Sequence, residues 1–133
     1  MRTILSVAIL LLPLALDAAE LGCANTLPPA QLQTCSQAQA DKAQQRLDGL
    51  MKELRKSSTA KNWEYLKTSQ ILWEKSRAYD CRVEASFEGI ALQTSVRYQC
   101  EAWYSRERMH QLRYVLCPRY WQSGQCDVEK DYE

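Results

Sequence analysis

The chain has 133 residues, and 17 lysines and arginines stand against 16 aspartates and glutamates, so the formal net charge is only +1. This balance argues against a dedicated nucleic-acid-binding protein, which carries a basic surplus on one face. The six cysteines predict about three disulfides in an exported chain of this size. About 110 residues beyond the N-terminal stretch can bury one modest core, so we expect a single domain.

The N-terminus has the pattern of a secretory signal peptide. Arg2 precedes an almost entirely aliphatic stretch over residues 4–16, and small residues follow it. An apolar core of roughly 7–15 residues suits a signal peptide, whereas a membrane-spanning helix needs about 20. We therefore predict a signal peptide over residues 1–19, a periplasmic or secreted product, and no transmembrane segment in the mature chain. Lipidation of Cys23 is disfavoured, because Glu20 stands where a lipoprotein signal has an aliphatic residue.

Helical periodicity covers most of the remaining chain and predicts an all-α fold. Apolar stripes at steps of three and four predict helices over about residues 28–56, 60–83 and 90–116. Thr26 is the expected cap of the first helix, and Ser57, Ser58 and Thr59 end it and supply a cap for the second. The expected buried stripes contain Leu32, Cys35, Gln39, Ala43, Leu47, Leu50 and Leu54, then Trp63, Leu66, Gln70, Trp73, Arg77 and Cys81, then Val96, Cys100, Trp103 and Leu112.

The expected organisation is a small three-helix domain over residues 20–117, followed by a disulfide-closed loop and an acidic tail over residues 118–133. If the first two helices form an antiparallel hairpin, Cys35 and Cys81 face each other at its open end. The preferred scheme then pairs Cys35 with Cys81, Cys117 with Cys126, and Cys23 with Cys100. A second scheme keeps Cys117–Cys126 but pairs Cys23 with Cys81 and Cys35 with Cys100, and the sequence leaves the choice open.

No convergent set of catalytic groups stands out in the sequence. His110 is the only histidine and falls inside the third predicted helix, where a surface position is the simplest interpretation. A zinc site needs several His or Cys ligands at fixed spacing, and paired cysteines leave no thiolate nucleophile. We therefore expect no metal, no cofactor and no enzymatic activity. A hydrolase built on surface carboxylates is the alternative from the enzyme class.

One polar and aromatic constellation lies on a single face of the second predicted helix. Its spacing of i, i+3, i+7 and i+11 joins Gln70, Trp73, Arg77 and Cys81. The simplest interpretation is structural, with Trp73 in the core and polar groups at its edge. The alternative is that Arg77 meets a partner. Arg108 in the third helix invites the same two interpretations, and a buried Arg108 would need a carboxylate such as Asp48 or Glu107.

At these residues the sequence resembles the LprI-type lysozyme-inhibitor family, which consists of small exported bacterial domains. The family pattern has an early cysteine pair, then Leu-Asn, then Gln-x-x-Trp-x-x-x-Arg-x-x-x-Cys, and finally Cys-x-x-x-x-Thr-x-x-Arg-x-x-x-Leu. The matching residues here are Cys23, Cys35, Leu47, Asp48, Gln70, Trp73, Arg77, Cys81, Cys100, Ser105, Arg108 and Leu112. Asp48 replaces the family's Asn and Ser105 its Thr, while residues 87–89 read Phe-Glu-Gly where the family has Gly-Gly-Ser.

The resemblance implies a periplasmic or cell-surface helical domain that binds and inhibits a lysozyme-type peptidoglycan hydrolase. The candidate partner-binding residues are Phe87, Glu88, Tyr120, Trp121, Asp127 and Glu129. The acidic tail would steer the chain towards a basic lysozyme. One alternative is an immunity or accessory protein that binds another envelope toxin or enzyme without inhibiting lysozyme. Another is that the aromatic residues only fill a thin core.

Overall fold

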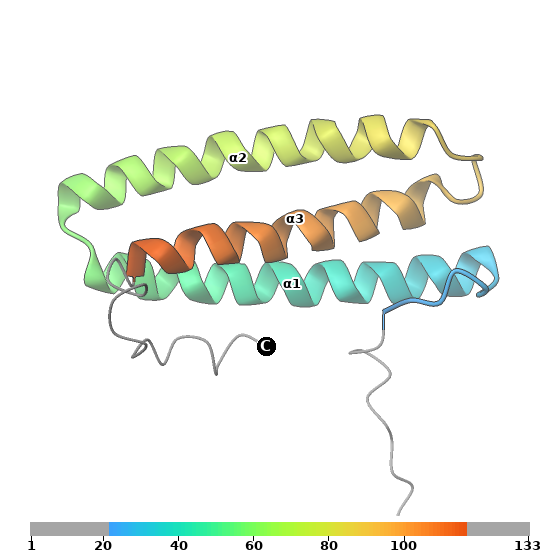
Figure 1. Cartoon of the computed structure of the whole chain (residues 1–133), viewed down its shortest axis with the longest axis horizontal. Coiled ribbons are helices and arrows are strands. Elements are labelled where there is room, and N and C mark those ends of the chain that lie inside the picture. The colour runs from blue at the N-terminus through green and yellow to red at the C-terminus, as the bar shows by residue number, and fades with distance from the viewer. Residues whose placement is uncertain (1–21, 117–133) are drawn as a thin grey trace, which may run out of the picture.

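The computed structural model describes residues 22–116, which form three helices (Figure 1). α1 spans Pro29–Ser57, α2 spans Ala60–Ser86 and α3 spans Gln93–Leu116. Residues 22–116 contain no strand, so the predicted all-α class is confirmed. Within the same residues, no helix combines the length and the apolarity that crossing a bilayer requires. The predicted signal peptide, Cys117, Cys126 and residues 118–133 lie outside the described part of the chain.

Local sequence signals set the first two helix starts. Pro29 takes the first position of α1, where its missing N–H leaves no intrahelical bond unmade. The predicted cap at Thr26 is wrong, because Pro28 holds the N-cap position and makes no side-chain cap hydrogen bond. Thr59 caps α2 as predicted, since its hydroxyl accepts a hydrogen bond from the backbone N–H of Asn62 at 3.2 Å.

The connection between α2 and α3 is longer than the sequence predicts. α3 begins at Gln93 rather than near Ile90, and residues 90–92 form a turn instead. In this turn the backbone N–H of Leu92 donates to the carbonyl oxygen of Gly89 at 2.8 Å. The turn displaces the start of α3 by three residues, and it leaves Ile90 on the connecting segment.

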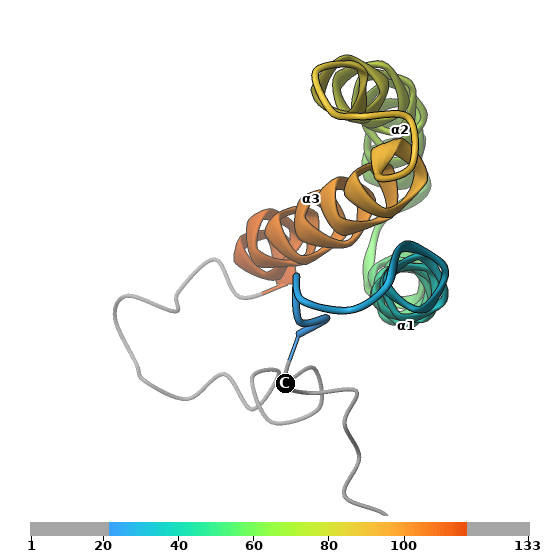
Figure 2. The ribbon, with the colours of Figure 1, turned by 90° about the vertical axis from the view of Figure 1, so that its right-hand side faces the viewer.

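The third helix lies between the other two (Figures 1 and 2). α1 and α2 run antiparallel, as predicted, but each packs chiefly on α3. One face of α3 completes a core with α1 that consists of Leu47, Leu50, Leu54, Met109 and Leu112. A second cluster of small residues, Ala40, Ala43 and Ala102, lets the same two helices approach closely. A neighbouring face of α3 meets α2, and Leu66 and Trp73 of α2 also pack against this core.

Both predicted disulfide schemes are wrong for the four cysteines that the structure describes. Cys81 pairs with Cys100 and so joins α2 to α3, while Cys23 pairs with Cys35 and ties the segment before α1 to its second turn. The reason is the position of α3. Because α3 lies between α1 and α2, the cysteine of α2 meets a cysteine of α3 and not one of α1.

Trp103 is also placed differently from the prediction, which had it buried in the third helix. Its neighbour Ala102 occupies the position that faces α1 and is 1 % exposed, whereas Trp103 is 52 % exposed. The Trp103 ring meets the edge of the Tyr104 ring, with the centroids 5.1 Å apart. A helix face that packs closely on a neighbour favours the small residue, so the larger ring turns outwards.

Candidate functional site

The family-motif residues of α2 and α3 meet around the ring of Trp73. The guanidinium carbon of Arg77 lies 4.8 Å from the ring centre, and that of Arg108 lies 5.6 Å from it. Trp73 itself is half-buried between the helices and packs on the main core. Each guanidinium group is attracted by the ring quadrupole, and indole is the strongest aromatic partner for such a cation.

Arg77 connects all three helices through a single nitrogen. Its Nη1 donates to Oε1 of Gln44 on α1 and to Oγ of Ser105 on α3, at 2.7 Å in both cases. Ser105 is almost fully buried, and its hydroxyl donates in turn to the carbonyl oxygen of Glu101 at 2.8 Å. The sequence pattern indicates Arg77 and Ser105, but it gives no sign that Gln44 is the partner on α1.

Arg108 is held by neutral oxygens, not by the carboxylate that the sequence predicts. Its Nε donates to Oε1 of Gln70 at 3.1 Å, its Nη2 to Ser69 at 2.9 Å and its Nη1 to Gln111 at 3.2 Å. Asp48 instead accepts a hydrogen bond from Gln44 at 2.8 Å. The expectation of a carboxylate assumed full burial, whereas Arg108 is half-buried and keeps part of its hydration. This partial desolvation lowers the pKa of Arg108.

We infer that this cluster fixes how α2 and α3 pack and does not contact a partner. Its polar groups are used within it: Gln70 accepts from Arg108 and donates to Glu74 at 3.1 Å. The disulfide Cys81–Cys100 joins the same two helices nearer to the turn that connects them. A site for a ligand would instead leave donors directed at solvent.

Neither a metal-binding cluster nor a free thiol is found among residues 22–116. Within residues 22–116, no group of three or more His, Cys, Asp and Glu side chains comes close enough to hold a metal ion. His110 is exposed on α3, and the described cysteines are all in disulfides.

The turn between α2 and α3, residues 87–92, lies at one end of the helices, at the right in Figure 1. Phe87 is 84 % exposed and Ile90 is 90 % exposed, and Glu88 between them is exposed as well. Among the predicted partner-binding residues, Phe87 and Glu88 are therefore accessible. Tyr120, Trp121, Asp127 and Glu129 lie outside the described residues.

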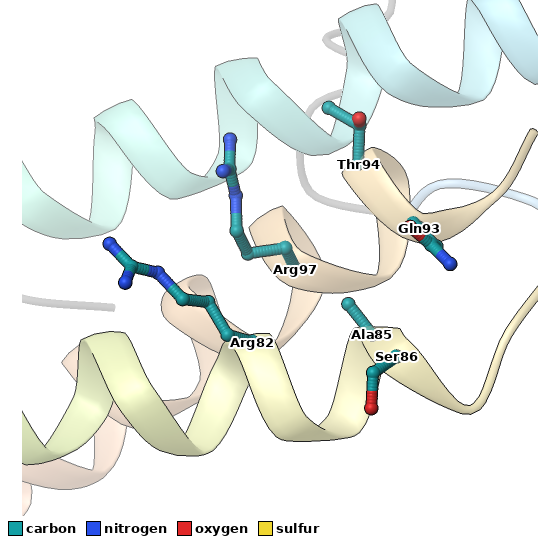
Figure 3. A pocket seen from close by; sticks show the side chains of 6 residues that line it. All are labelled: Arg82, Ala85, Ser86, Gln93, Thr94 and Arg97. Atoms are coloured by element: carbon teal, nitrogen blue, oxygen red, sulfur yellow. The ribbon is translucent and has the colours of Figure 1, made fainter. Parts of the chain in front are cut away.

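A shallow pocket of about 200 Å³ lies beside this turn, between α2 and α3 (Figure 3). It is lined by Arg82, Ala85, Ser86, Gln93, Thr94 and Arg97. The volume is below the roughly 300–1,000 Å³ of typical small-molecule sites. Of its two arginines, Arg97 is ion-paired with Glu101 at 3.7 Å and Arg82 lies over the Tyr79 ring. Nothing in the sequence indicates this pair of arginines, because they are 15 residues apart on different helices.

The comparison with protein families matches residues 23–112 to the family described as Lysozyme inhibitor LprI. The chain belongs to the LprI lysozyme-inhibitor family. The resemblance seen in the motif residues is thereby confirmed, and the family is one of inhibitors and not of catalysts. No curated protein and no solved structure gave a match in the corresponding searches. Family membership and the two disulfides together indicate an extracytoplasmic protein.

Proposed function

We propose that this LprI-family protein binds a lysozyme-type peptidoglycan hydrolase and inhibits it through the turn between α2 and α3. The observation that carries the proposal is the exposure of two large apolar side chains, Phe87 and Ile90, at the tip of this turn. Apolar side chains so far from any core mark interaction sites when they occur together. On this proposal the protein is not an enzyme, and it is exported to the periplasm or secreted by way of the predicted signal peptide.

The chemistry of a lysozyme cleft suits this end of the molecule. A glycosidase of this kind holds two carboxyl groups in a concave cleft that receives sugar rings. Phe87 and Ile90 would occupy the sugar-binding surface of such a cleft. The acidic tail, including Asp127 and Glu129, would steer the encounter with a basic lysozyme, and Tyr120 and Trp121 remain further candidate contacts.

The test is a cell-wall lysis assay with c-type lysozyme and the oxidised chain from Glu20 to Glu133. The wild-type chain is expected to inhibit at stoichiometric concentration. The double variant Phe87→Ser/Ile90→Ser is expected to lose at least about thirtyfold in inhibition, as for residues at an interface hot spot. Leu72→Ser/Tyr79→Ser, which removes two other exposed apolar side chains (62 % and 67 % exposed), is the matched control and should inhibit normally.

Two results would reject parts of the proposal. Inhibition by the wild type that Phe87→Ser/Ile90→Ser leaves unchanged would exclude the turn as the inhibitory surface. Deletion of residues 127–133 tests the tail separately: slower association in low salt is expected, and unchanged kinetics would remove the tail from the mechanism.

The departure of residues 87–89 from the family's Gly-Gly-Ser favours one second candidate function. Because the most exposed turn differs from the family pattern, an immunity or accessory protein for another envelope toxin or enzyme would carry its specificity here. No inhibition of lysozyme, together with capture of an envelope enzyme that the Phe87→Ser/Ile90→Ser variant fails to capture, would establish this function instead.

A further inference from the structure

A second exposed apolar surface runs along α2 on the side that faces away from α3. It consists of Tyr65, Leu72, Tyr79 and Val83, each 58–67 % exposed, and we call it the outer face of α2. Steps of seven, seven and four residues place these side chains on one line of a helix. The buried residues Gln70 and Cys81 lie on the opposite side, against α3. α2 stands at the edge of the arrangement of described helices, so neither α1 nor α3 covers this face (Figure 2).

Positive charges accompany the outer face. Lys61, Lys75 and Arg82 are exposed and follow one another on a line directly beside the apolar one. Within residues 22–116, none of these three side chains forms an ion pair. Arg82 lies over the Tyr79 ring, 5.7 Å from its centre. The acid on the same side, Glu64, is already paired with Lys67 at 2.8 Å. The outer face is therefore apolar and cationic on a chain that is almost neutral overall.

A helical partner does not fit this pattern. A coiled coil needs apolar residues at two positions of each heptad. If Tyr65, Leu72 and Tyr79 take the first apolar position of each heptad (a), the second apolar position (d) falls on Thr68, Lys75 and Arg82. Lys61, seven residues before Thr68, lies on the same line. In the other register the remaining apolar position of each heptad falls on Ser69, Ser76 and Val83, of which only Val83 is apolar. The first register would bury Lys75 and Arg82 in the seam, which costs free energy unless each is paired. Neither register supplies the two continuous apolar positions of a coiled coil.

We propose that the outer face of α2 lies on the surface of an anionic bilayer. A bilayer needs no complementary groove, and a single helix with an apolar line and a basic line beside it is a form that can lie in the interface plane. Leu72 and Val83 would enter the acyl boundary. The Tyr65 and Tyr79 rings suit the headgroup level. Lys61, Lys75 and Arg82 can extend their charged ends to anionic headgroups while their aliphatic stems cover apolar surface.

This surface is separate from the proposed inhibitory turn. Neither Phe87 nor Ile90 belongs to the outer face, and none of the residues substituted in the vesicle experiment belongs to the turn. The proposal therefore stands or falls independently of lysozyme inhibition, and the two sets of variants test them separately.

The experiment is flotation with vesicles, using the oxidised chain from Glu20 to Glu133, which lacks the apolar stretch 4–16 that would itself bind lipid. Vesicles of three parts phosphatidylcholine to one part phosphatidylglycerol are expected to carry the protein up the gradient, and pure phosphatidylcholine vesicles to carry far less. Lys61→Ser/Lys75→Ser should lower partitioning into the anionic vesicles by roughly twenty- to thirtyfold, since each cation near such a surface contributes about fivefold. Added salt should weaken wild-type binding.

Leu72→Ser/Tyr79→Ser should also lose vesicle binding, and Phe87→Ser/Ile90→Ser serves as the matched control that keeps it. Far-UV circular dichroism checks that each variant is folded, which the exposure of all these side chains leads us to expect. Absence of wild-type flotation with anionic vesicles would overturn the proposal, as would binding that Leu72→Ser/Tyr79→Ser leaves intact. Sedimentation of the wild type as a dimer that this variant dissociates would assign the face to a second copy and overturn it equally.

Discussion

The guanidinium group of Arg77 lies over the Trp73 ring one turn earlier on α2, while its Nη1 donates to Gln44 on α1 and to Ser105 on α3. One side chain thus contacts every helix of the domain. The geometry explains why a long, thin three-helix arrangement needs a polar cluster at all. α1 and α2 share little direct packing, so a hydrogen-bonded bridge past α3 adds a connection that apolar contacts do not supply.

Arg77→Lys is expected to destabilise the protein by about 1–2 kcal/mol, although it conserves the charge. An ammonium group cannot reproduce the planar geometry that reaches Gln44, Ser105 and the Trp73 ring together. Urea denaturation followed by circular dichroism measures the change. Arg106→Lys, at an exposed position of α3, is the control and should remain within about 0.5 kcal/mol of the wild type. Equal stabilities for the two variants would contradict the bridging role of Arg77.

Trp73→Ala is expected to cost about 2–4 kcal/mol, because it removes a ring that packs on the core and leaves two arginines without their aromatic partner. Trp103→Ala is the matched control in α3. Its ring is half exposed and contacts chiefly Tyr104, so the expected loss is below about 1 kcal/mol. Thermal unfolding of the two oxidised variants makes the comparison, and a larger loss for Trp103→Ala would contradict the placement of these rings.

Peptide mapping without reduction is expected to recover Cys23 linked to Cys35 and Cys81 linked to Cys100. Cys81→Ala/Cys100→Ala should lower the free energy of unfolding by about 3 kcal/mol in the loop-entropy account, because this bridge closes a loop with a sequence separation of 19. Cys23→Ala/Cys35→Ala, with a separation of 12, should cost slightly less. A peptide that links Cys35 to Cys81 would show that α1 and α2 pair directly at their open end.

Tyr104 is expected to ionise late in an alkaline titration. Desolvation raises its pKa, and the charges of Asp80 and Glu84 together with the hydrogen bond to Asp80 at 3.3 Å raise it further. The folded state therefore holds this proton more tightly than the unfolded chain. The resulting contribution to stability is complete below the ordinary pKa of 10.0 and is lost as the pH rises through the folded value.

Spectrophotometric titration of phenolate absorbance tests this assignment. Tyr104→Phe should remove the late component, and Asp80→Asn should move it to lower pH, because the neutral amide no longer repels a phenolate. A late component that persists in Tyr104→Phe would belong to another tyrosine.

The sequence by itself determined the three helices and most of their ends. The apolar residues from Leu32 to Leu54 recur with the 3.6-residue period of a helix, and this period alone is sufficient to predict α1. The cap at Thr59 needs only a hydroxyl three residues before a free N–H. Family membership likewise follows from the sequence, because the motif is defined by residue types at fixed spacing. Gln70, Trp73 and Arg77 match it independently of how their helix packs.

Only the tertiary structure decided which helices pack together. Periodicity shows that a helix has an apolar face, but it does not show which neighbour covers that face. α3 carries Met109 and Leu112 towards α1 and Cys100 and Ser105 towards α2, and this two-sided burial places it between them. The disulfide pairing follows from that position.

The same limit applies to surfaces. The period of α2 places Tyr65, Leu72 and Tyr79 on one line in the sequence alone, yet a line of apolar residues is ordinarily read as a buried face. Burial is a property of the assembled helices, because it depends on what lies opposite each side chain. Only the placement of α2 at the edge of the domain shows that these residues, like Phe87 and Ile90, face the solvent.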